Sequence, residues 1–141
     1  MREMTTEEAT DFLLSGTRTG KLAWVGQDGR PHVAPIWFVL DGDDVIFNTH
    51  EDSGKAKAPR REGQASMVVD DEAPPYAFVK VDGSVTVDDD LDRVRAVATK
   101  IGGRYMGADR AEEFGARNGV PGELIVRLSP TRVTAMADLS G

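Results

Sequence analysis

The stretch KLAWVGQDGRPHVAPIWFVLDGDDVIFNT, residues 21–49, alternates apolar runs with two tight-turn signals. The pair Asp28-Gly29 in the first turn is typical of a β-hairpin, because the central residues of such a turn adopt positive φ angles. The run DGDD at residues 41–44 predicts a second tight turn. We therefore expect strands over residues 21–26, 31–40 and 45–49, joined as an antiparallel meander.

The flanking sequence adds further strands and three helices. Thr5 and Glu8 have the spacing of a capping box and predict a helix over 5–15. Further strands are expected over 64–71, 76–87 and 122–136, and helices over 88–103 and 109–119. Gly83 indicates a bend or bulge in its strand, and Ser129-Pro130 is expected to break the last segment into two strands. The resulting prediction is a mainly β fold, a β-barrel with helical decorations, in a single domain over residues 1–141.

In the turn expected between the two later helices stand Arg104 and Tyr105. We interpret them as packing residues, with a place in the wall of a substrate pocket as the alternative.

The composition narrows the classes of function. The chain of 141 residues has a formal net charge of -7 and no cysteine, which excludes disulfides, zinc-thiolate sites and cysteine nucleophiles. An acidic protein of this kind is not expected to bind nucleic acid, which requires a broad basic face. No apolar run approaches the roughly 20 residues that span a bilayer, and the acidic N-terminal segment does not resemble a signal peptide. We therefore expect a cytoplasmic protein that does not bind a membrane.

A basic cluster interrupts this acidic chain at residues 50–64, HEDSGKAKAPRREGQ. Its four cations are Lys55, Lys57, Arg60 and Arg61. Free backbone N–H groups at Ser53 and Gly54, next to lysines, are typical of a phosphate-binding nest, whereas a solvated surface loop is the simpler alternative. Because proline is tolerated only in the first turn of a helix, we expect a loop that leads into a short helical turn near Pro59.

Several well-known site motifs are missing from the sequence. Gly54-Lys55 lacks the upstream glycine and the following Ser or Thr of a Walker loop, since Thr49 and Ala56 occupy those positions. There is no G-x-G-x-x-G after a strand, no H-x-x-x-H and no G-x-S-x-G. We expect no metal site, and no residue is identified as a catalytic acid or base.

An aromatic residue two positions after a proline gives a second candidate feature. Pro35 removes one hydrogen-bond donor from its strand, which favours an edge position. Trp37 follows it and is interpreted either as a core residue or as a platform for a flat ring.

Taken together, these motifs carry a resemblance to a known family. They are P-x-W-F at 35–38, F-N-T at 47–49, K-x-K at 55–57, R-R at 60–61, V-D-D at 69–71 and P-P-Y-x-F-V at 74–79. In this order they resemble the flavin and deazaflavin split-barrel proteins of the pyridoxamine 5'-phosphate oxidase superfamily, and within it the actinobacterial branch that uses coenzyme F420. Relatives often have Asn-Leu where this chain has Ala58-Pro59, and the substrate-phosphate residues of the oxidase itself are not recognisable.

The resemblance implies a six-stranded split β-barrel that forms a homodimer with the cofactor at the interface. By position it implies that Lys55 and Lys57 hold the cofactor phosphate near Ser53 and Thr49, that Pro35, Ile36 and Trp37 line the ring, and that Asn48 lies by the ribityl chain. It further places Tyr76 and Phe78 at the substrate pocket or on the partner subunit, and Arg60 and Arg61 at the anionic tail. The implied reaction is hydride transfer from reduced F420 to a flat conjugated small molecule such as a quinone, an enone or a tetrapyrrole. An FMN-binding oxidoreductase and a non-catalytic cofactor-binding dimer are the alternatives.

Overall fold

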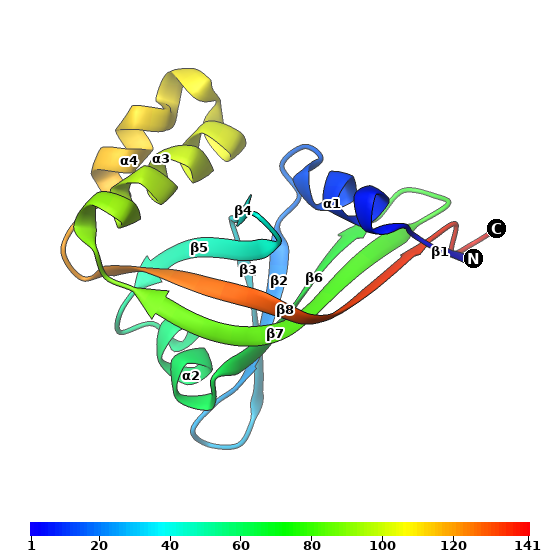
Figure 1. Cartoon of the computed structure of the whole chain (residues 1–141), viewed down its shortest axis with the longest axis horizontal. Helices are drawn as coiled ribbons and strands as arrows, with labels where there is room; N and C mark the ends of the chain where they lie inside the picture. Colours follow the sequence, from blue (N-terminus) through cyan, green and yellow to red (C-terminus); the bar gives the residue numbers. More distant parts are fainter.

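The computed structural model describes residues 1–141 and is built on one curved antiparallel sheet (Figure 1). Its strands are β1 (Arg2–Glu3), β2 (Gly20–Val25), β3 (Pro31–Ile36), β4 (Val39–Asp41), β5 (Asp44–His50), β6 (Gln64–Asp71), β7 (Ala77–Asp88) and β8 (Glu123–Ala137). Its helices are α1 (Thr6–Leu14), α2 (Gly54–Glu62), α3 (Leu91–Met106), the short 3-10 helix η1 (Ala108–Arg110) and α4 (Ala111–Asn118). None of the helices combines the length and the apolar character that crossing a membrane requires.

The order of the strands explains how the sheet curls into a barrel without closing. The order is β3-β2-β6-β7-β8-β5-β4, and β1 pairs separately with β8. The two edge strands, β3 and β4, are consecutive in the chain and are joined only by Trp37 and Phe38. The prediction of a mainly β split barrel with helical additions is therefore confirmed. The sheet has eight strands rather than six because the two-residue β1 and the three-residue β4 join the six longer ones.

The predicted meander over residues 21–49 is wrong at its centre. The expected strand 31–40 is two strands, and β5 pairs with β8 instead of with β3. The chain bends at Phe38, whose side chain is completely buried. Its backbone N–H donates to the Tyr105 hydroxyl over 3.2 Å instead of to a neighbouring strand. A side-chain contact with α3 thus replaces the strand pairing that the local pattern favoured.

The basic cluster forms a helix, which corrects the prediction of a loop. Helix α2 runs from Gly54 to Glu62 with Pro59 inside it, and it ends at Gly63 in the left-handed conformation, with φ 72°. Proline in this position leaves one carbonyl of the preceding turn without its helical donor. The buried side chains of Ala56, Ala58 and Pro59 pack against the sheet and offset that loss.

The other local predictions have mixed outcomes. The capping box is confirmed, since Glu8 N–H donates to the Thr5 hydroxyl and Thr5 N–H donates to the Glu8 carboxylate. The bulge expected at Gly83 is confirmed by a register shift between Asp82 and Gly83. The predicted break at Ser129-Pro130 is wrong, because β8 is continuous. Pro130 pairs with Gly83 at the register shift, next to Thr131, which has no partner there, and a missing donor is tolerated at such an irregularity.

Two hydrophobic clusters lie on the two faces of the sheet. The main core fills the inside of the curved sheet, and its largest completely buried side chains include Phe38, Phe47 and Leu128. The second cluster is small and consists of Ile46, Val94 and Ile125, which join the outer face of β5 and β8 to α3. Helices α3 and α4 therefore lie outside the barrel, above β5 in Figure 1.

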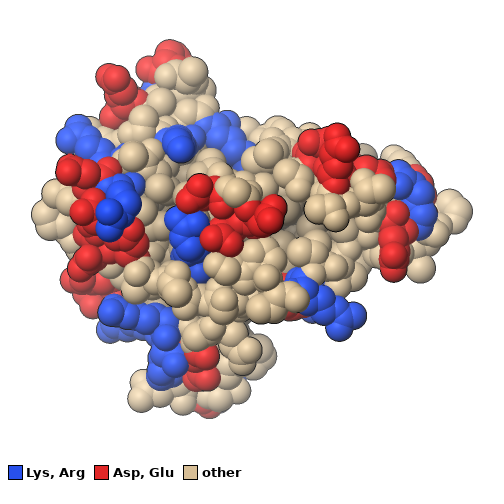
Figure 2. All heavy atoms as spheres, in the orientation of Figure 1, with Lys and Arg blue, Asp and Glu red and all other residues tan.

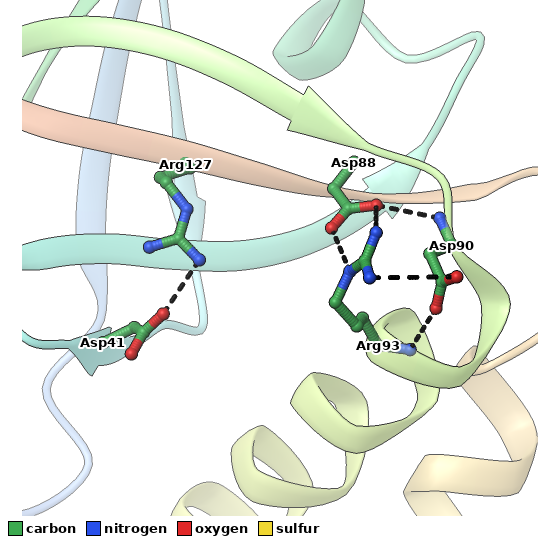
Figure 3. Close-up of polar contacts among 5 residues, drawn as sticks. All are labelled: Asp41, Asp88, Asp90, Arg93 and Arg127. Atoms are coloured by element: carbon green, nitrogen blue, oxygen red, sulfur yellow. Dashed lines mark hydrogen bonds and ion pairs between the residues drawn. The ribbon is translucent and has the colours of Figure 1, made fainter.

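Charged side chains fasten α3 at its start (Figure 3). Arg93 donates two hydrogen bonds to Asp88, of 2.6 and 3.2 Å, and Asp90 caps the helix by accepting from the Arg93 N–H. The hydrogen bonds from Arg93 hold the pKa of Asp88 below its usual range. In the same region Arg127 of β8 pairs with Asp41 and Asp44 over 2.9 and 3.0 Å, which ties β8 to the β4–β5 hairpin.

Candidate ligand-binding pocket

A pocket of about 360 Å³ lies between the outer surface of the sheet and the α3–α4 pair. Its lining comes from the end of β3, from β5, from the start of α2, from α3 and α4, and from the first residue of β8. The thirteen lining residues are Pro35, Ile36, Trp37, Asn48, Thr49, His50, Lys55, Ala98, Ile101, Gly102, Phe114, Asn118 and Glu123. Six of the twelve predicted site residues are among them, so residues distant in the sequence converge here.

Trp37 forms an aromatic wall of the pocket. Its indole is stacked on the Tyr105 ring, with centroids 5.0 Å apart and planes inclined by 5°, and the Phe114 ring is tilted against it at 6.1 Å. The side chain is 39% exposed, so the interpretation of Trp37 as a core residue is wrong. The ring presents an open apolar surface whose orientation is set by its aromatic neighbours.

Arg104 and Tyr105 hold the bend that carries this tryptophan. The Arg104 guanidinium donates to the carbonyls of Leu13, Phe38 and Gly16 over 2.7, 2.7 and 3.1 Å. The Tyr105 hydroxyl donates to the Arg18 carbonyl over 2.9 Å while it accepts from Phe38. Both residues belong to the last turn of α3 rather than to the predicted turn between helices. Burial lowers the pKa of Arg104 and raises that of Tyr105.

The end of β5 and the start of α2 bring polar groups to the pocket. The Thr49 and Ser53 hydroxyls are hydrogen-bonded at 2.8 Å, and Asn48 Nδ2 lies 3.5 Å from the Val94 carbonyl. Ser53 is the N-cap of α2 but makes no side-chain capping bond. The first N–H groups of a helix have no acceptor within the helix. Together with the Lys55 side chain, they make this end of α2 suited to an anion.

The remaining cations of the basic cluster do not line this pocket. Lys57 lies 3.7 Å from Asp52, and Arg61 donates to the Val25 carbonyl and to Glu62. Arg60 is exposed on α2. Basic side chains gather over the region of α2 in Figure 2, whereas acidic and basic groups are interspersed over the rest of that face. Of the four cations in the basic cluster, only Lys55 therefore lines the pocket within one chain.

Tyr76 and Phe78 lie apart from the pocket within this chain. Tyr76 precedes β7 with a positive φ of 60° and lines a different hollow, beside Arg2 and Arg18. Phe78 is in β7, opposite Asp70 and Met136. Their assignment to the substrate pocket or to the partner subunit stays a prediction.

The sequence did not point to the helical side of the pocket. Gly102 of α3 lies so close to Phe114 of α4 that an added Cβ would overlap the Phe114 Cβ, and Gly115 approaches Thr99 in the same way. Ile101 of α3 and Phe114 of α4 both line the pocket. The sequence predicted the two helices, but it did not indicate which surface of the sheet they cover.

Glu123 is a candidate site residue that no motif of the sequence indicated. It is the first residue of β8, lies opposite His50 of β5 and lines the pocket. Its Oε2 is shielded from solvent and has no hydrogen-bond partner. Burial raises the pKa of Glu123, and the neighbouring His50 opposes that shift.

These features define a split-barrel protein with a ligand pocket on the outer surface of its sheet, lined by an aromatic ring and a cation. The family model for pyridoxamine 5'-phosphate oxidase matches residues 5–137, and the chain belongs to that family. A search of curated protein sequences finds no match.

Solved structures with the same fold come from several proteins. A conserved hypothetical protein from Mycobacterium tuberculosis is 23% identical, with a TM-score of 0.83 over 98% of this chain and 89% of that one. A protein described as an F420 reductase is 27% identical, with a TM-score of 0.68 over 87% and 94% of the two chains. An FAD-binding protein from Mycobacterium smegmatis is 24% identical, with a TM-score of 0.64 over 96% and 98%.

Proposed function

We propose that the protein is an F420-dependent reductase that acts on a flat conjugated small molecule such as a quinone, an enone or a tetrapyrrole. The observation that carries the proposal is the meeting of the Trp37 ring with Lys55 and the amino end of α2 in one pocket. An aromatic face and a cationic helix start suit a phosphorylated ligand with a planar ring. The family and the 27% identical F420 reductase add support.

The residues on the sheet side of the pocket would divide the work of binding. Lys55 and the first N–H groups of α2 would hold the phosphate, with the hydroxyls of Ser53 and Thr49 beside them. Asn48 would contact the ribityl chain. Lys57, which carries a weak and exposed ion pair, would turn toward the phosphate as well. Charge-assisted hydrogen bonds of this type contribute about 1.5–3 kcal/mol each.

The ring would lie against the bend. Pro35 and Ile36 would contribute backbone groups at the end of an edge strand, and Trp37 would contribute its exposed face. A bound deazaflavin would supply the hydride, and the protein would bind the cofactor, orient it and exclude water from one side of its ring. Arg60 and Arg61 would meet the anionic tail on the exposed surface of α2. Ala58-Pro59 replaces the Asn-Leu of relatives, but α2 is continuous through these residues. The N-terminal end of α2, which would bind the phosphate, therefore keeps its helical geometry.

The proposed assembly is a homodimer that completes the pocket. A volume of about 360 Å³ is at the small end of ligand pockets, and its wall at Pro35 belongs to the edge strand β3. Along that strand Val33 is 68% exposed, and an uncovered apolar edge favours pairing with another chain. In this assembly Tyr76 and Phe78 would reach the site from the partner subunit.

Titration of the purified protein with F420 and with FMN, followed by fluorescence, tests the proposal. We expect saturable binding of F420, and oxidation of the bound reduced form when a quinone or an enone is added. Tighter binding of FMN would instead favour the FMN-binding oxidoreductase. Binding of F420 without oxidation by any member of the substrate panel would favour the non-catalytic dimer, and binding of neither cofactor would refute the proposal.

A further inference from the structure

Glu123 is an acidic residue in a pocket that otherwise suits an anion. The only other titratable residues in the lining are His50 and Lys55. His50 lies directly across the β5–β8 pairing from Glu123, and its Nδ1 accepts a hydrogen bond from the Asp52 N–H. Lys55 stands at the start of α2. An ionised Glu123 would repel the phosphate that this end of the helix favours.

The surroundings of the carboxyl group disfavour its ionised form. Oε2 is shielded from solvent and has no hydrogen-bond partner, although the residue as a whole is half-buried. A charge without a partner is costly where water is excluded. The helical side of the pocket offers no cation, since its lining residues are Ala98, Ile101, Gly102, Phe114 and Asn118. The neutral acid differs from the carboxylate in one decisive way, because its O–H can donate a hydrogen bond.

We propose that Glu123 takes part in ligand binding as a neutral carboxylic acid that donates a hydrogen bond to an acceptor oxygen of the bound cofactor. The inference rests on the proposed function, because the cofactor supplies the acceptor. It assigns a contact that no motif of the sequence indicates. A neutral donor and the cation Lys55, which line the same pocket, can bind one anionic ligand together.

Cofactor binding then depends on the proton of Glu123. If only the protonated form of Glu123 binds well, affinity must fall as the pH rises through the pKa of this group, by up to about tenfold for each pH unit. Burial moves the pKa of Glu123 upward, so this loss begins above the ordinary range of a glutamate. Other pH effects on binding are separated from that of Glu123 by comparison with a variant that cannot ionise at position 123.

The test compares the wild-type protein with Glu123→Gln, which keeps the size and a donor group but cannot ionise. The dissociation constant for F420 is measured for both proteins between pH 5 and 8.5. We expect the ratio of the wild-type constant to the variant constant to rise by about tenfold or more over this range, because pH effects that do not involve Glu123 are common to both proteins. Calorimetry in two buffers of different ionisation enthalpy should show proton uptake on binding to the wild type and less uptake with the variant.

His50→Gln is the matched control, since it removes the other titratable group of the pairing and leaves Glu123 in place. In this variant the dissociation constant for F420 should still rise with pH, but the rise should begin at higher pH, because His50 lowers the pKa of Glu123 in the wild type. A ratio that stays constant with pH, in proteins that bind F420, would overturn this inference and leave the proposed function intact. Failure of all three proteins to bind F420 at any pH would overturn both.

Discussion

The two walls of the pocket differ in chemistry and in origin. The strand wall comprises the lining residues of β3, the bend, β5, α2 and β8, which are Pro35, Ile36, Trp37, Asn48, Thr49, His50, Lys55 and Glu123. The helical wall comprises Ala98, Ile101, Gly102, Phe114 and Asn118 from α3 and α4. The strand wall carries every charged group and the unsatisfied N–H groups of a helix start. The helical wall is apolar except for Asn118.

This difference separates recognition from shape. The strand wall supplies the directional contacts that distinguish one ligand from another, and its residues are held in place by the sheet. The helical wall sets how much room is left above them, and its position depends on how α3 packs on α4 and on the bend. Changes in the strand wall should therefore alter affinity at nearly constant stability, whereas changes in the helical wall should alter stability first.

Arg104→Met breaks the link between the two walls and should have the largest effect. The substitution leaves the carbonyls of Leu13, Gly16 and Phe38 without the guanidinium that binds them. We expect the free energy of unfolding to fall by about 3 kcal/mol, measured by urea denaturation, since hydrogen bonds to a charged group contribute about 1.5–3 kcal/mol each and do not add fully.

Arg95→Met, on the exposed side of the same helix, removes the same charge and serves as the control. It should change the free energy of unfolding by less than about 0.5 kcal/mol. Equal losses for the two variants would show that Arg104 does not fasten the bend.

Gly102→Ala breaks the helical wall from within. The added methyl group would overlap Phe114, so α3 and α4 must move apart. Overpacking of this kind costs about 1–3 kcal/mol, and we expect a loss of about 2 kcal/mol in the free energy of unfolding.

The neighbouring substitution Gly103→Ala sharpens the comparison. An added Cβ there meets the Ala111 Cβ at 3.4 Å, which is ordinary contact, and alanine favours a helix over glycine by up to about 1 kcal/mol. The two substitutions should therefore shift the urea midpoint in opposite directions. A shift in the same direction for both would contradict the proposed role of close α3–α4 packing.

Lys55→Ala tests the strand wall and should have the smallest effect on the fold. We expect F420 to bind about tenfold more weakly, which corresponds to about 1.4 kcal/mol, because one charge-assisted contact to the phosphate is lost. The urea midpoint should stay unchanged, since Lys55 forms no ion pair that the fold needs.

Lys100→Ala, an equal change of charge on the exposed face of α3, is the control for Lys55→Ala and should leave the affinity for F420 unchanged. Equal affinities for the Lys55→Ala variant and the wild type would remove Lys55 from the site.

The contrast between the walls also explains which features could be predicted from the sequence. Four pocket residues lie in short motifs that could be recognised from their order in the sequence, namely Trp37, Asn48, Thr49 and Lys55. The structure brings these four together. The helical wall depends on where α3 settles, which is decided by contacts such as those of Arg104 with residues about 66 to 91 positions away.

Two errors in the predicted fold have the same source. The continuous strand 31–40 and the loop at residues 53–58 both follow from local rules about turns and proline. In the structure, the Tyr105 hydroxyl takes the Phe38 N–H away from strand pairing. Burial of Ala56, Ala58 and Pro59 outweighs the missing proline donor in α2. Tertiary contacts determined the structure of both segments, and such contacts cannot be identified from neighbouring residues in the sequence.

The two-residue connection between the edge strands has a consequence for engineering the topology. The chain termini already meet, with the Met1 amino group 3.5 Å from the Gly141 carbonyl, so they can be joined by a short linker. A circular permutant that opens between Trp37 and Phe38 would have its new ends beside the last turn of α3, where Arg104 and Tyr105 contact Phe38. The curvature of the sheet in this permutant would show whether noncovalent contacts can hold the bend at Phe38 when the backbone is cut.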